Sequence, residues 1–234
     1  MDKYNFVLDK DEQTSISQYF TKVFGLMSFG LVCTALIAYS FASSELTQKM
    51  FEFGGMVPFY VLMGFELLLV WYLSKNVLTL SKTISAALFV FYALLNGVTL
   101  SVIFYVYSMG SIASTFFITS ATFGLMSLYG YITKTDLTKL GSFLMMGVMG
   151  IVVASVVNIF LGSDTLQWII SFIGVFIFIG LTAYDTQKIK NNYYAAQDDN
   201  ELKDKLAITG ALSLYLDFIN LFLFLLRFIG GSRD

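Results

Sequence analysis

The sequence has no histidine and few charged side chains. Histidine is the usual acid–base side chain near neutral pH and a common zinc ligand, so its complete absence argues against histidine-based catalysis, His zinc sites and histidine pH switches. Charged residues make up 13% of the 234 residues and hydrophobic residues 57%, whereas a soluble domain has about 25% charged residues. The chain therefore has too little polar surface to cover a soluble globule, which indicates an integral membrane protein.

Cysteine and proline are nearly absent as well. Cys33 is the single cysteine, so it cannot form a disulfide within the chain, and we expect it to be a small buried hydrophobic side chain. With one proline, the helices should run with little kinking. The formal net charge of −2 and the lack of a long basic run give no indication of nucleic-acid binding.

Seven apolar runs are each near the length of about 20 residues that a helix needs to cross a bilayer. They are at 23–44, 57–74, 84–107, 111–133, 140–162, 166–186 and 206–229. The sequence therefore predicts an all-α integral membrane protein with seven transmembrane helices. Residues 1–22 are expected to be a polar cytoplasmic segment without a removable signal peptide, and 23–234 a single membrane domain.

The distribution of lysine and arginine predicts the orientation, because cytoplasmic loops are enriched in both. An N-terminus in the cytoplasm places 11 of the 14 basic residues on the inner side: Lys3, Lys10, Lys22, Lys75, Lys82, Lys134, Lys139, Lys188, Lys190, Lys203 and Lys205. The outer side then has Lys49, Arg227 and Arg233. We expect a cytoplasmic N-terminus and, after seven crossings, an external C-terminus, in a bacterial plasma (inner) membrane.

The last apolar run contains an acidic residue near its middle, Asp217. Ser213 and Asn220 lie four residues before it and three after it, so all three occur on one side of a helix. A carboxylate at that depth costs about 3 kcal/mol on insertion scales, and such groups usually face protein or water and have a partner. Asp217 is therefore the first candidate functional residue.

Asp185, at the inner end of the sixth run, is the second candidate. The connection 187–205 joins its helix to that of Asp217, so the two helices are expected to be antiparallel neighbours. Hydropathy places Asp185 near the interface and Asp217 deeper; they meet if the last helix begins near Asp204 or if the inner mouth is a water-filled funnel. Two adjacent carboxylates in low dielectric would share one proton, and when deprotonated they would offer oxygen ligands to Ca²⁺.

Glu66, in the second run, is a third intramembrane carboxylate. It is expected to face the same cavity or to pair with Lys75 or with amides such as Asn96 and Asn158. A structural hydrogen-bonding role and an ion-pathway role both fit these residues. No further group indicates a resident cofactor.

Three motifs resemble signatures of the Bax inhibitor-1 family, also called the TMBIM family: FYALLNGVTLSVIF at 91–104, LTAYDTQKIK at 181–190 and ALSLYLDFINLFLFLLRFIG at 211–230. The resemblance extends over all seven runs. It implies six helices around a central seventh and a pH-sensitive calcium leak. It also implies that Asp185 and Asp217 form the sensing pair, and that Glu66 corresponds to the family's second-helix glutamate.

One position departs from this resemblance. Many relatives have an arginine just beyond the second helix that can pair with the sixth-helix aspartate, whereas this sequence has Asn76 at or near that position and Lys75 beside it. Lysine lacks the bidentate geometry of arginine, so a latch to Asp185 should be weaker or differently placed.

Two functions fit the sequence. One is a cation leak, chiefly for calcium, controlled by protonation of Asp185 and Asp217. The alternative is a non-transporting regulator that binds a membrane protease or another membrane complex. An enzyme is not expected: Asp217 lies in LYLDF and lacks the Gly-x-Gly-Asp pattern of intramembrane aspartyl proteases, and a rhomboid-type serine protease would need a histidine base.

Overall fold

The computed structural model describes residues 10–196 and 199–231, and it is almost entirely helical over these ranges. Seven helices are long and apolar enough to cross a membrane, which confirms the predicted number. They are α1 (Lys10–Ala42), α3 (Val57–Asn76), α4 (Lys82–Leu100), α6 (Met109–Ile132), α7 (Thr138–Leu161), α8 (Asp164–Ala195) and α9 (Asn200–Ile229). Two short helices, α2 (Glu45–Gly54) and α5 (Ile103–Val106), connect α1 to α3 and α4 to α6.

Short polar side chains set where several of these helices begin. In each case a side-chain oxygen accepts a hydrogen bond from the backbone N–H three residues later, which satisfies one of the free donors of the first turn. The capping residues are Ser81 for α4, Ser108 for α6, Ser163 for α8 and Asp199 for α9. Helix α7 ends at Leu161, and the next residue, Gly162, has a φ of +60°, the left-handed conformation that glycine adopts without strain.

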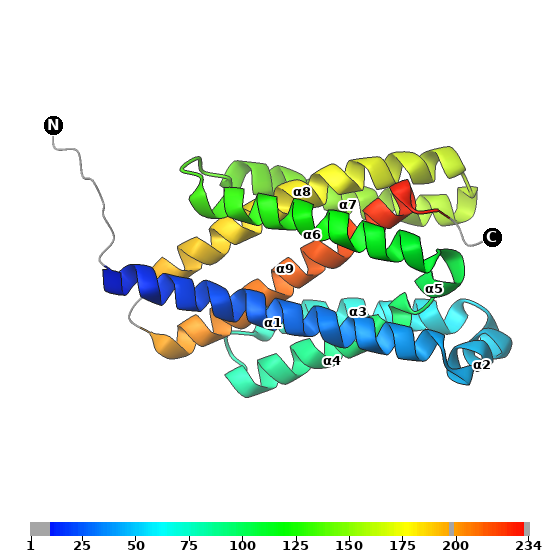
Figure 1. The fold of residues 1–234 in the computed structure, drawn as a ribbon, viewed down its shortest axis with the longest axis horizontal. Helices are drawn as coiled ribbons and strands as arrows, with labels where there is room; N and C mark the ends of the chain where they lie inside the picture. The colour runs from blue at the N-terminus through cyan, green and yellow to red at the C-terminus, as the bar shows by residue number, and fades with distance from the viewer. Residues whose placement is uncertain (1–9, 197–198, 232–234) are drawn as a thin grey trace.

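The helices form two layers with α9 between them (Figure 1). Helices α1, α3 and α4 lie on one side and α6, α7 and α8 on the other, and α9 runs obliquely through the middle. Half of the 30 residues of α9 are buried, and it packs against α1, α4, α6 and α8. The main contacts of α3 and α7 are instead with α4 and α8, so four spans form the immediate surroundings of α9.

Helix α1 begins earlier than hydropathy predicts. It starts at Lys10, within the segment 1–22 that the sequence assigns to the cytoplasm, and Ile16, Tyr19 and Phe20 are buried in the core. These positions lie on one face of the helix together with Val23. The polar residues between them lower the average hydropathy of this segment, so a hydropathy analysis does not detect the first turns of the helix. Residues 1–9 lie outside the described part of the chain.

The connection between the last two spans is also mostly helical. Helix α8 continues to Ala195 and α9 begins at Asn200, so the segment 187–205 extends both helices instead of forming a loop. This extension means that Asp185 and Asp217 lie well inside their helices, ten residues before the end of α8 and seventeen after the start of α9.

Candidate functional site

Asp217 is buried in the middle of α9. Its side chain is only 4% exposed, and its Oδ2 atom has no hydrogen-bond partner among the described residues. A buried carboxylate oxygen without a donor is costly, and native structures rarely retain one without a functional reason. Asp217 is therefore the side chain of this bundle that most requires a proton, a water molecule or a cation.

Asp185 lies on α8, which packs against α9 over much of its length. Its side chain is half-buried, and Lys188, one turn further along α8, is the cation whose charge acts on it. Asp185 is in turn the acidic group whose charge acts on Asp217. The structure thus brings the two predicted aspartates within electrostatic reach of each other.

Asp217 Oδ2 forms no hydrogen bond with Asp185 or with any other residue that the structure describes. Counted from the α8–α9 connection at 1.5 Å per residue, Asp185 lies about 15 Å and Asp217 about 25 Å along its helix. Helices α8 and α9 both run obliquely through the bundle and pack against each other over much of their length (Figure 1), so this offset separates the two side chains along the helix pair. The described contact between the two aspartates is therefore electrostatic: the charge of Asp185 acts on Asp217.

Glu66 belongs to a separate set of buried polar side chains, which we call the buried polar chain: Thr34, Glu66, Asn96, Thr99 and Tyr215. Glu66 accepts hydrogen bonds from Asn96 Nδ2 at 3.1 Å and from Thr99 Oγ1. Tyr215 donates from its hydroxyl to Asn96 Oδ1 at 3.1 Å, and this hydroxyl lies 2.6 Å from Thr34 Oγ1. The buried polar chain joins α1, α3, α4 and α9, so it fixes α9 against the layer of α1, α3 and α4.

The pairing of Glu66 with Asn96 confirms one of the alternatives that the sequence left open. Asn158 instead accepts a hydrogen bond from the Ser163 backbone N–H at the end of α7. The sequence analysis missed the roles of Tyr215 and Thr34, because tyrosine and threonine are common in membrane helices. Tyr215 lies two residues before Asp217, which places it on nearly the opposite side of α9, so the search for partners of Asp217 did not include it.

The other residues predicted for the site are Ser213 and Asn220 on α9 and Lys75 on α3. Ser213 and Asn220 are half-buried on α9, and the Asn220 amide donates to the Leu216 carbonyl of its own helix at 2.8 Å. The Lys75 ammonium lies 5.1 Å from the centre of the Trp71 ring, on the exposed side of α3. Lys75 therefore interacts with its own helix, and the structure shows no latch between it and Asp185 in the described residues.

The site does not have the donor set of a resident metal centre. No group of three or more acidic or cysteine side chains suited to a metal ion occurs in the described ranges. Ca²⁺ takes six to eight oxygen ligands, so two aspartates could supply only part of its coordination shell.

Seven spans with buried carboxylates define a multi-pass helical membrane protein. The family model described as "Inhibitor of apoptosis-promoting Bax1" matches residues 16–234, which is most of the chain. The chain belongs to the Bax inhibitor-1 family, as its motifs at 181–190 and 211–230 indicate.

Bacterial relatives match over nearly their full length. The inner membrane protein YbhL of Escherichia coli K12 is 46% identical over 223 residues, which is 94% of each chain. An uncharacterized protein of Borreliella burgdorferi is 47% identical over 226 residues, or 97% of each chain. An uncharacterized membrane protein of Streptococcus pyogenes is 36% identical over 236 residues, covering 97% of this chain and 98% of its own.

Proposed function

We propose that this chain is a passive cation leak, chiefly for Ca²⁺, whose flux is set by the protonation of Asp185 and Asp217. The observation that carries this proposal is the buried Asp217 carboxylate, which lacks a donor on Oδ2 and lies within reach of the Asp185 charge. We assign the protein to a bacterial inner membrane, because its relative YbhL is an inner membrane protein. The lysine distribution predicts a cytoplasmic N-terminus.

The proposed mechanism follows from like charges in a medium of low dielectric. Two ionised carboxylates near each other inside the bundle repel, and either a proton or a cation between them removes this repulsion. Protons and Ca²⁺ therefore compete for the same pair. Protonation removes the negative charge that attracts the cation, and it also changes the force between α8 and α9, so pH controls both the occupancy and the packing of these helices.

The surface of α9 supports a pathway next to this pair. Along the helix, Thr209, Ser213, Leu216 and Asn220 are half-buried, whereas most residues between them are buried. This stripe has the three- and four-residue spacing of one helix side, and it passes beside Asp217. Three of its four members have a side-chain oxygen, which can replace water in the shell of a passing cation.

Calcium flux into liposomes tests the proposal. The purified protein is reconstituted around a calcium-sensitive dye, and the initial flux is measured over a pH series for the wild type, Asp185→Asn and Asp217→Asn. We expect a pH-dependent flux in the wild type and a flattened profile in both variants, because asparagine cannot exchange the proton.

Asp136→Asn is the matched control. Asp136 is an exposed carboxyl group between α6 and α7, and hydrogen bonds from Thr138 hold its pKa below the ordinary value, so it stays ionised near neutral pH. Its variant should keep the wild-type profile. An unchanged profile in Asp217→Asn would refute the proposal, and a wild type without flux would favour the alternative, a non-transporting regulator of another membrane complex.

A further inference from the structure

The short helix α2 lies at the end of the bundle opposite to the α8–α9 connection (Figure 1). It joins the end of α1 at Ala42 to the start of α3 at Val57, which are two membrane-spanning helices. Because each neighbouring span ends there, α2 is at the depth of a membrane surface. Its ten residues are too few to cross a bilayer.

One side of α2 is fixed to the bundle. Thr47 is fully buried and donates a hydrogen bond to the Phe41 carbonyl at the end of α1. The Phe51 ring packs against Phe59 of α3, with the ring centres 5.1 Å apart, and against Tyr105 of α5 at 5.8 Å. The orientation of α2 about its own axis is therefore determined by these contacts.

A second side is polar and exposed. It has Glu45, Gln48, Lys49 and Glu52. The Lys49 ammonium pairs with Glu45 Oε2 at 3.3 Å, and Gln48 donates to Glu52 at 3.2 Å, so these groups interact with one another along the helix surface. Such a face is suited to water and lipid headgroups.

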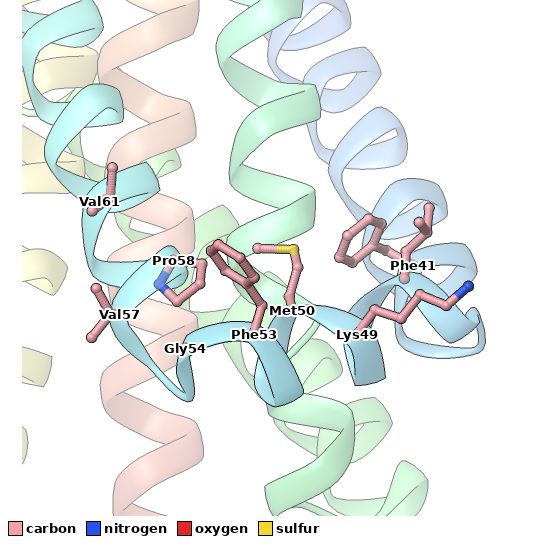
Figure 2. Close-up of a pocket in the computed structure, with 9 residues that line it drawn as sticks. Phe41, Lys49, Met50, Phe53, Gly54, Val57, Pro58 and Val61 are labelled. Carbon is pink, nitrogen blue, oxygen red and sulfur yellow. The ribbon is translucent and has the colours of Figure 1, made fainter.

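The third side of α2 is apolar and largely exposed. It consists of Leu46, Met50 and Phe53, spaced by four and three residues; Leu46 is 57% exposed and Phe53 is 91% exposed. Figure 2 shows Met50 and Phe53 pointing from α2 into a pocket between Phe41 of α1 and Pro58 of α3, and the Lys49 ammonium pointing away from it.

This apolar side continues the surface that the spanning helices present to the bilayer. Next to the pocket, Val57 and Val61 of α3 are 63% and 68% exposed, as expected of side chains that face lipid. Helices with one apolar side and one charged side bind in the plane of the membrane interface, with the apolar side among the acyl chains. The fixed rotation of α2 points its apolar side toward this lipid-facing surface.

We propose that α2 is an interfacial helix and that the acyl chain of a bilayer phospholipid fills the pocket between α1, α2 and α3. Leu46, Met50 and Phe53 contact the acyl chain, and Lys49 at the rim lies at the level of the phosphate groups. Because α1 ends and α3 begins next to α2, this lipid contact holds the first two spans at a fixed depth.

Tryptophan fluorescence in vesicles of phosphatidylcholine tests this inference. Trp71 and Trp168, the two tryptophans of the chain, are replaced by phenylalanine, and a single tryptophan is introduced by Phe53→Trp or Leu46→Trp. Gln48→Trp, on the polar side of the same helix, is the matched control. Emission is recorded in vesicles whose acyl chains are brominated near the headgroup and in vesicles without bromine.

Bromine should strongly reduce the emission of the Phe53→Trp and Leu46→Trp variants and reduce that of Gln48→Trp much less, because only the apolar side of α2 reaches the acyl chains. Equal, weak quenching at all three positions, with emission typical of water, would overturn the proposal. Blue-shifted emission without quenching at 53 would also overturn it, because it would show that protein, such as a second copy of the chain, covers this side.

Discussion

Replacing Gly130 with alanine should separate α6 from α8 and destabilise the protein. A Cβ atom at this position would overlap the carbonyl oxygen of Ala183 on α8 and lie 2.9 Å from its carbonyl carbon and Cα, whereas Cβ contacts are normally 3.4 Å or longer. The obstacle is backbone, so no rotation of a side chain can relieve it. Ala183 is two residues before Asp185, and the same displacement therefore moves a residue of the proposed sensing pair.

The expected magnitude follows from a comparison with Gly124 on the same helix. A Cβ at Gly124 would have nothing within 4 Å, so Gly124→Ala adds only the helix preference of alanine, up to about 1 kcal/mol. Overpacking at Gly130 costs about 1–3 kcal/mol. Because Gly130→Ala gains the same helix preference, the difference between the two variants equals this packing cost.

Thermal unfolding in detergent, followed by intrinsic fluorescence, measures the difference. For a chain of this size about 2–4 °C of Tm corresponds to 1 kcal/mol, so Gly130→Ala should unfold several degrees below Gly124→Ala. Equal Tm values for the two variants would show that α6 and α8 are not in backbone contact at this position, and would refute the packing described for these two helices.

Two further predictions concern buried hydrogen bonds and use equilibrium unfolding in detergent mixtures. Tyr215→Phe removes the hydroxyl that contacts both Asn96 and Thr34, and since hydrogen bonds between membrane helices are worth about 0.6 kcal/mol each on average, we expect a loss of about 1 kcal/mol; no loss would contradict these two bonds. Gln187→Ala removes the acceptor of the Leu137 backbone N–H, 2.8 Å away, and should cost about 1–3 kcal/mol, whereas Gln167→Ala, exposed on the same helix, should cost little. Equal losses of stability in the two glutamine variants would show that the hydrogen bond from Leu137 to Gln187 does not stabilise the protein.

The number of membrane helices could be predicted from the sequence because the cost of burying polar groups in lipid makes each span a long apolar run. The same signal does not detect helices outside the hydrocarbon region. Helix α2 is ten residues long and mixed in polarity, and the start of α1 at Lys10 is amphipathic, so both are recognised only from their packing on the bundle.

The site could be predicted only in part. Asp185, Asp217 and Glu66 are recognisable because charged residues are rare within apolar runs, and the Glu66–Asn96 contact was one of the predicted pairings. Hydropathy predicted that Asp217 lies deeper than Asp185, but the size of this offset could not be predicted, because it depends on how far α8 and α9 extend beyond their apolar runs. Lys75 was a candidate by its position in the sequence, but its side chain lies over Trp71 on the exposed side of α3.

Infrared spectroscopy of the protein in lipid bilayers tests most directly whether Asp185 and Asp217 act as a pair. A carbonyl band of a protonated carboxyl group that is present in the wild type and absent in Asp217→Asn reports the protonation of Asp217, and its dependence on pH can be compared with that of the calcium flux. We expect Asp185→Asn to move the midpoint of this band and to flatten the flux profile. A band whose midpoint is the same with and without Asp185 would contradict the coupling on which the proposed function depends.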